Sequence, residues 1–182
     1  MKNFITLFTH SGRELKKLRC ITLLAMLGAI SMVLGYFTIS IGNFLKIGFT
    51  FLPNQTAFYL FGPVAGGIFG GAMDILNYFI KPTGPFFFGF TFDAILSGVI
   101  FGAFLYKKPL SIKRIFIVSA VEMIIVNLIL HTYWLSILQG KAFLALLPLR
   151  ALKSIIMLPI ETILLFTLLK YLESSGIKKI FQ

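Results

Sequence analysis

The chain has 182 residues, of which 58% are hydrophobic and 13% are charged. A soluble domain is closer to half apolar and a quarter charged, so this composition argues against a soluble protein and favours a membrane protein. The formal net charge of +11 would suggest nucleic-acid binding in a soluble chain. Here the cations lie in terminal and loop segments between apolar runs, so they indicate membrane topology, and we expect no nucleic-acid partner.

Apolar segments fall at 20–39, 50–62, 63–80, 88–106, 112–138 and 148–172. A membrane-spanning helix needs about 20 apolar residues. We therefore predict an all-α integral membrane protein with six transmembrane helices, the second of them short. The second and third helices are separated by Gly62-Pro63, a strong helix breaker.

The whole chain, 1–182, is expected to form one transmembrane domain. We assign 1–19 to a cytoplasmic N-terminal segment, 20–172 to the six-helix bundle and 173–182 to a cytoplasmic tail. The segments 1–19, 107–114 and 170–179 hold twelve Lys and Arg residues, whereas the loops on the opposite side hold three. Positive charge collects on the cytoplasmic side of membrane proteins, so this bias places both termini in the cytoplasm.

Small residues mark possible packing faces. Ala25 and Ala29 lie one helical turn apart in the first helix, and small residues at this spacing let another helix approach closely. The spacing alone leaves open whether that helix belongs to a partner or to this chain. Glycines with a similar spacing in the third and fourth helices predict internal packing seams: Gly66, Gly67, Gly70, Gly71, Gly98 and Gly102.

The segment from Pro82 to Phe90 holds two prolines, two glycines and four phenylalanines, and predicts an ordered loop at the outer surface. Such a loop could cover a planar ligand with its aromatic faces. It could instead belong to an aromatic belt at the membrane interface. Lys81 precedes the loop, where it could snorkel to the interface or meet a ligand carboxylate. It shares a helix face with Asp74, which is expected to need a structural partner within the membrane.

Asn127, His131 and Trp134 are spaced to form one stripe near the outer end of the fifth helix. An amide, an imidazole and an indole suit a heteroaromatic ligand, although a lone histidine is often only a satisfied core residue. A metal site is not expected, because His10 is the second and last histidine and lies in the N-terminal segment.

Arg150 and Lys153 lie one turn apart at the start of the sixth helix. A charge at membrane depth is costly and is usually retained for a ligand or a pathway. Arginine can grip a carboxylate with two parallel hydrogen bonds, and lysine can add a point charge. The alternative is snorkelling to lipid headgroups.

No motif of a hydrolase, a metalloprotease or a nucleotide-binding loop is present, so we expect neither an enzyme nor a cofactor. If ATP energises transport, another chain must bind it.

The segments 82–87, 127–140 and 145–159 resemble the substrate-binding S components of energy-coupling factor (ECF) vitamin transporters, in particular those specific for folate. The resemblance covers about 20–172. It implies a bacterial plasma-membrane protein with six helices and an outward-facing pocket closed by loops. It also implies an ECF module as partner, with two cytoplasmic ATPases and one membrane coupling subunit. In that family Ala25 and Ala29 would form the docking motif for the coupling subunit.

The resemblance implies high-affinity binding of folate or a reduced folate, with uptake driven by the ECF module. We expect aromatic residues to face the rings, cations to face the carboxylates, and Asn127 and His131 to meet the pterin edges. His131 stands where the family commonly has Asn. The complete expected site comprises Lys81, Gly84, Phe86, Phe87, Phe88, Asn127, His131, Trp134, Arg150 and Lys153.

Two alternatives remain. The chain could be an S component for another vitamin or a vitamin precursor. It could also be a membrane enzyme or assembly factor, but its acidic residues are scattered over four helices: Asp74, Asp93, Glu122 and Glu161.

Overall fold

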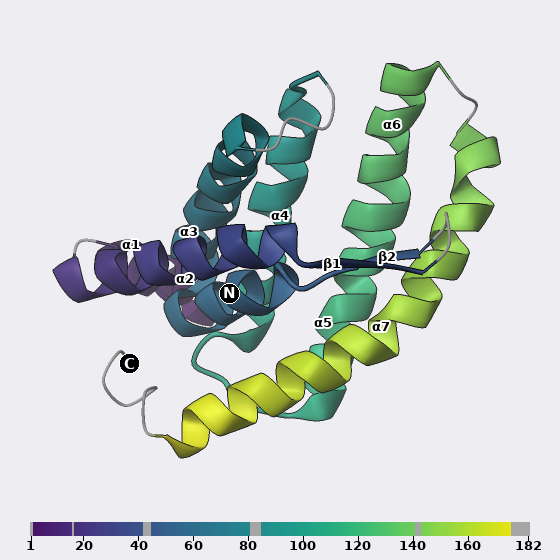
Figure 1. Cartoon of the computed structure of the whole chain (residues 1–182). Coiled ribbons are helices and arrows are strands. Elements are labelled where there is room, and N and C mark those ends of the chain that lie inside the picture. The colour runs from purple at the N-terminus through teal and green to yellow at the C-terminus, as the bar shows by residue number, and fades with distance from the viewer. Residues whose placement is uncertain (1, 16, 42–44, 81–84, 141–142, 176–182) are drawn as a thin grey trace.

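The computed structural model describes residues 2–15, 17–41, 45–80, 85–140 and 143–175. Two helices come first, α1 (Lys2–Glu14) and α2 (Leu18–Tyr36), followed by the strands β1 (Thr38–Ile41) and β2 (Leu45–Gly48). The remaining elements are α3 (Phe51–Ile80), α4 (Phe88–Leu105), α5 (Ile112–Glu122), the π-helix η1 (Met123–Leu130), α6 (His131–Gln139) and α7 (Phe143–Ser174). Figure 1 shows α2 and the C-terminal part of α7 running across the direction of α4 and α6.

Five helical segments of the described chain are long and apolar enough to cross a membrane: Leu18–Tyr36, Phe51–Ile80, Phe88–Leu105, Ile112–Leu138 and Arg150–Ser174. They overlap the expected apolar segments. The difference in number arises at α3, which is one continuous element where the sequence predicts two helices.

The chain reverses direction within α3 at Gly62, whose φ of 83° and ψ of −170° are not helical. A positive φ of this size favours glycine. In a straight helix, Phe58 and Gly70 would lie about 18 Å apart, yet a Cβ on Gly70 would lie 3.6 Å from the Phe58 ring. The rings of Phe58 and Phe69 also meet at 6.4 Å. The two halves of α3 therefore fold back on each other, as the Gly62-Pro63 breaker predicts.

Helix α1 holds this turn through one buried hydroxyl. Ser11 Oγ donates to the carbonyl of Phe61 at 2.6 Å and accepts from the backbone N–H groups of Val64 and Ala65 at 3.0 and 3.1 Å. These backbone groups lie at the end of one helical half and the start of the next, where helices lack internal partners. Ser11 therefore caps both halves of α3 from a separate helix.

The seam between α3 and α4 is made of glycines packed backbone to backbone. A Cβ on Gly98 would collide with the backbone of Gly66, and one on Gly102 would collide with the backbone at Gly62 and Pro63. A Cβ on Gly70 would meet the carbonyl of Ala94. The predicted internal seams are thus confirmed for this helix pair.

Two local features differ from the sequence-based expectation. The first apolar helix ends at Tyr36, before the predicted residue 39, and residues 38–48 hold an antiparallel strand pair in which Thr38 pairs with Gly48. The fold therefore includes one strand pair beside its helices. β1 is rich in β-branched residues, which favour strands, and its backbone groups pair with those of β2. The second difference is η1, which widens the middle of the predicted fifth helix.

Candidate binding site

A cavity of about 580 Å³ has five tyrosine and phenylalanine side chains and the ring of His131 among its lining residues. We call it the aromatic cavity. It lies between the end of α2, residue 50, the second half of α3, the segment 85–90 and α6. Its lining residues are Met32, Gly35, Tyr36, Thr50, Asp74, Asn77, Tyr78, Ile80, Pro85, Phe86, Phe87, Phe90, His131, Leu135 and Leu138.

Ring contacts organise the wall formed by residues 85–90. Phe86 packs edge-on against Tyr78 at 5.0 Å, and Phe90 lies 4.7 Å from the His131 ring, measured between ring centroids. Such offset and edge-to-face pairs are the favoured aromatic geometries. They give the cavity a wall of ring faces and edges that suits a planar ligand.

Part of the predicted loop is helical. Helix α4 begins at Phe88, so Phe88 and Phe90 belong to its first turn, and Phe88 is 77% exposed. Phe88 is not among the residues that line the aromatic cavity, and its expected contact with ligand stays a prediction. Lys81 and Gly84 lie outside the described residues.

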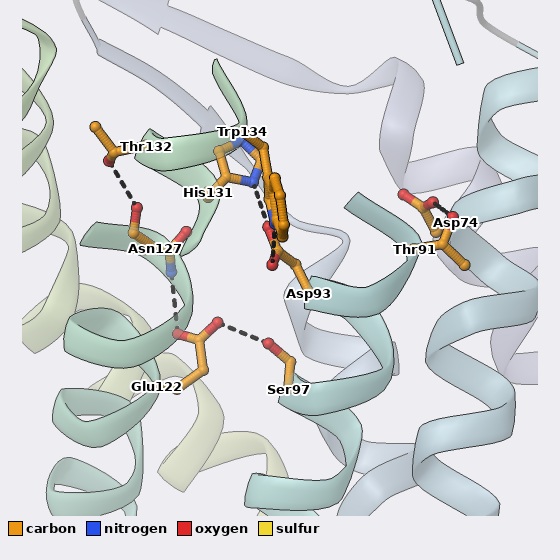
Figure 2. A network of polar contacts seen from close by, with 9 residues as sticks. All are labelled: Asp74, Thr91, Asp93, Ser97, Glu122, Asn127, His131, Thr132 and Trp134. Atoms are coloured by element: carbon orange, nitrogen blue, oxygen red, sulfur yellow. Dashed lines mark hydrogen bonds and ion pairs between the residues drawn. The ribbon is translucent and has the colours of Figure 1, made fainter. Parts of the chain in front are cut away.

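Asp74 has the structural partner that the sequence predicts it to need. Its Oδ2 accepts a hydrogen bond from Thr91 Oγ1 at 2.7 Å, which links α3 to α4 (Figure 2). Asp74 also lines the aromatic cavity. A carboxylate with one bonded oxygen can still accept hydrogen bonds from a ligand.

Asp93 belongs to α4, and its side chain faces α6. The residue is buried, with 4% of its surface exposed. Its Oδ1 accepts from the indole Nε1 of Trp134 at 3.1 Å, and its Oδ2 lies 3.3 Å from Nδ1 of His131 (Figure 2). Trp134 in turn packs against Phe87 at 5.5 Å between ring centroids. Trp134 thus supports the cavity wall from behind and is not among the lining residues.

The π-helix redirects Asn127. Asn127 Nδ2 donates to Glu122 Oε2 at 3.0 Å, and Thr132 Oγ1 donates to the Asn127 carbonyl at 3.2 Å, so both partners lie five residues from Asn127. A π-helix has a wider turn than an α-helix, and it often occurs at functional sites. Asn127 therefore does not share one stripe with His131 and Trp134, because the predicted i, i+4, i+7 pattern assumes a regular α-helix.

A second, charged cavity of about 320 Å³ lies between η1 and α7. It is lined by Arg150 and Lys153 together with Glu122 and Glu161, and by Asn127. Arg150 Nε is buried and has no hydrogen-bond partner among the described residues. An unpaired buried donor is costly, so the Nε–H group is a candidate donor for an anionic ligand.

A third, central cavity of about 260 Å³ adjoins the other two. It shares Asp74 and Asn77 with the aromatic cavity, and it shares Phe51 and Glu122 with the charged cavity. Thr50 lines all three cavities. The three spaces are therefore neighbours that meet at the start of α3.

The structure brings the predicted site residues together in two groups. Phe86, Phe87 and His131 line the aromatic cavity, whereas Asn127, Arg150 and Lys153 line the charged cavity. Ala25 and Ala29 lie apart from both groups, on the exposed face of α2.

Sequence reasoning did not assign Thr50, Asp93 or Glu122 to a ligand site. Asp93 and Glu122 are charges within apolar segments, which is a signal for function. However, Asp93 bonds to Trp134, 41 residues away, and Glu122 bonds to Ser97, 25 residues away. No sequence pattern marks Thr50 as a residue of a ligand site. Within the described ranges, His, Cys, Asp and Glu side chains form no group of three that could bind a metal ion.

The sequence model for the family described as "ECF transporter, substrate-specific component" matches residues 19–169. The chain belongs to this family. It is therefore a membrane-embedded subunit of a bacterial transporter and not an enzyme, and the observed cavities are candidate substrate sites of an S component.

Related proteins agree with this assignment. The S component is 36% identical over 152 residues to the "Folate transporter FolT" of Clostridium novyi (strain NT), covering 84% of this chain and 88% of the relative. It is 32% identical over 171 residues to the "Folate transporter FolT" of Leuconostoc mesenteroides, and this match covers 90% of this chain and 92% of the relative.

A solved structure described as "Crystal structure of FolT bound with folic acid" is similar to this S component, with a TM-score of 0.74 and 33% sequence identity. The match covers 83% of this chain and 91% of that chain. The overall arrangement of helices is thus shared with a solved transporter subunit.

Proposed function

We propose that this S component binds folate or a reduced folate with high affinity and delivers it inward with an ECF module. The observation that carries the proposal is the pairing of an aromatic cavity with a charged cavity at Thr50. Folate has a planar pterin, an aromatic linker and an acidic glutamate tail, so it needs both kinds of surface. The relatives named for folate transport support the same ligand.

In this proposal the rings lie against Phe86, Phe87 and the neighbouring aromatic wall. Arg150 and Lys153 bind carboxylate groups, because buried cations pair favourably with anions in a low-dielectric space. His131 and Asn127 supply directional hydrogen bonds. Lys81 and Gly84 remain sequence-based candidates for the mouth of the site, and Trp134 supports the wall.

We also propose six membrane passes within one domain, with the two halves of α3 as the second and third passes. The first half is only about 16 Å long by its residue count. It would therefore be a short pass, as the sequence predicts for the second helix. Three contacts support a common side for both termini. Ser11 bonds at the α3 turn, Tyr106 packs on Gly62, and Tyr59 OH donates to Glu173 near the end of α7 at 2.5 Å. The cytoplasm is the side favoured by the positive charge near residues 107–114.

The membrane coupling subunit of the proposed module would dock on α2. Ala25 and Ala29 are exposed there, beside exposed apolar side chains such as Met26 and Val33. Small residues beside an apolar surface permit close approach of a partner helix within the membrane.

The direct test is isothermal titration of the purified, detergent-solubilised chain with folic acid, with thiamine, riboflavin and biotin as comparison ligands. We expect saturable binding of folic acid alone. Tight binding of a different vitamin, with no heat from folic acid, would identify an S component of another specificity and overturn the folate assignment.

Tryptophan fluorescence gives an independent readout, because Trp134 is the sole tryptophan and packs on Phe87 of the cavity wall. Folic acid should change the Trp134 emission in a saturable way. The folic acid concentration at half of the change should agree with the dissociation constant measured by calorimetry. A Trp134→Phe variant gives the tyrosine and ligand background, and a free tryptophan derivative titrated in parallel corrects for light absorbed by the ligand. Emission unchanged at saturation, after that correction, would contradict binding in the aromatic cavity.

A further inference from the structure

Asp93 is a buried carboxylate whose two oxygens serve different residues of α6. Oδ1 accepts the indole hydrogen bond of Trp134 at 3.1 Å, and Oδ2 faces Nδ1 of His131 at 3.3 Å. Figure 2 shows the imidazole and the indole converging on this one side chain. Ionised carboxylates are costly to bury without donors, so both contacts favour keeping Asp93 in place.

The contact with Asp93 decides which nitrogen of His131 carries hydrogen. Oδ2 has no hydrogen-bond partner among the described residues, so the 3.3 Å contact is electrostatic. A nitrogen lone pair facing a carboxylate oxygen at this distance would be repelled, so the nitrogen beside Asp93 carries the hydrogen. In a neutral imidazole the other nitrogen is then an acceptor. His131 lines the aromatic cavity, its side chain is 34% exposed, and Phe90 packs against its ring. Nε2 is thus the hydrogen-bonding atom that remains for a ligand.

We propose that Asp93 is a positioning residue that fixes His131 as the Nδ1–H tautomer, so that the cavity presents an imidazole acceptor to an N–H donor on the ligand ring. The ligand part of this inference rests on the proposed function, because pterins carry amino and ring N–H groups at their edges. The tautomer itself is a property of the ligand-free protein.

An Asp93→Asn substitution separates positioning from packing, because it keeps the size of the side chain. The amide oxygen can still accept from Trp134, and the amide nitrogen then donates to His131 Nδ1. His131 must become an acceptor at Nδ1 and carry its hydrogen on Nε2. The Ser-His-Asp triad of serine proteases offers a precedent. Replacing its aspartate by asparagine keeps the geometry but leaves the histidine in the wrong tautomer.

The experiment is long-range ¹H–¹⁵N NMR of the ligand-free chain with labelled histidine, at mildly alkaline pH in detergent micelles. The chain has two histidines, so a His10→Gln variant assigns the His131 signals. We expect Nδ1–H in the unmodified chain and Nε2–H in Asp93→Asn. The matched control is Asp74→Asn, which removes a different cavity carboxylate and should leave the tautomer at Nδ1–H.

Affinity is then measured by titration calorimetry. Asp93→Asn should bind folic acid about three- to tenfold more weakly, as expected for losing one hydrogen bond. An Nε2–H or doubly protonated His131 in the unmodified chain would overturn the proposal, and this measurement needs no variant to fold. A switched tautomer with unchanged affinity would also overturn the positioning role. A chain that does not bind folic acid but shows Nδ1–H would contradict only the assigned ligand.

Discussion

Thr50 occupies the junction of the three cavities, directly after the strand pair and before α3. Its carbonyl accepts from Ser31 Oγ at 3.4 Å, and its methyl group would lie 3.6 Å from a Cβ on Gly35. Thr50, whose carbonyl is bonded to α2, therefore lies between the aromatic cavity and the charged cavity. In the proposed binding mode, a ligand that occupies both cavities passes this residue.

Arg150 provides the residue-scale test of the charged cavity. We predict that Arg150→Ala weakens folic acid binding by about 1.5–3 kcal/mol, the range for hydrogen bonds to a charged group. The buried, unpaired Nε is the physical reason. Titration calorimetry measures the loss, and Lys113→Ala is the control, because Lys113 is an exposed cation outside the charged cavity. Equal affinity of Arg150→Ala and the unmodified chain would remove Arg150 from the site.

The sequence predicts the shared position of Arg150 and Lys153 better than it predicts the contacts of Asp93. The two cations are three residues apart, so helix periodicity places them on one face, and the structure brings both to one cavity. Asp93 depends on side chains 38 and 41 residues away, which no local pattern can pair. Long-range packing, and not local propensity, decides such contacts.

At the scale of elements, the seam between α3 and α4 leaves no space for a side chain. We predict that Gly98→Ala destabilises the protein by about 1–3 kcal/mol, because the added methyl group would collide with the backbone at Gly66. Gly12→Ala on α1 is the control, since a Cβ there meets nothing within 4 Å. Thermal unfolding in detergent compares the two variants. A Gly98→Ala protein as stable as the control would show that the seam can open without cost.

The cap on the α3 turn is a second test at this scale. We predict that Ser11→Ala lowers stability by about 1–3 kcal/mol, because buried backbone groups at Phe61, Val64 and Ala65 lose a partner. Ser174→Ala, which removes an exposed hydroxyl bonded to the Tyr171 carbonyl, is the matched control. Thermal unfolding measures the difference. Indistinguishable unfolding temperatures would mean that other groups hold the turn.

Most helices could be predicted from apolar runs, and the α3 turn from Gly62-Pro63, because both signals are local. The strand pair was missed, although Thr38 to Ile41 alternates in the manner of a strand, since the apolar run continues to it without a break. The π-helix has no comparable signal. Its wider turn changes which side chains share a face, so Asn127 bonds to Glu122, five residues away, and not in the α-helical pattern.

At the scale of the whole molecule, binding and transport should separate at α2. We predict that Ala29→Arg leaves folic acid affinity of the isolated chain unchanged and abolishes uptake in cells, because a large charged side chain blocks a close helix contact. Ala72→Arg is the control, since Ala72 is also exposed but lies on α3. Radiolabelled folate uptake at matched expression measures the effect. Normal uptake by Ala29→Arg would show that α2 faces lipid or only packs internally.

The Ser11 contact also constrains the order in which the chain can be assembled during synthesis. The groups that Ser11 binds lie 50 to 54 residues downstream. At bacterial elongation rates of up to about 20 residues per second, α1 waits roughly 3 s or longer before those groups exist. α1 therefore cannot dock on this turn until α3 has begun to be made, and a ribosome stalled before residue 61 should carry an α1 that a protease can still reach.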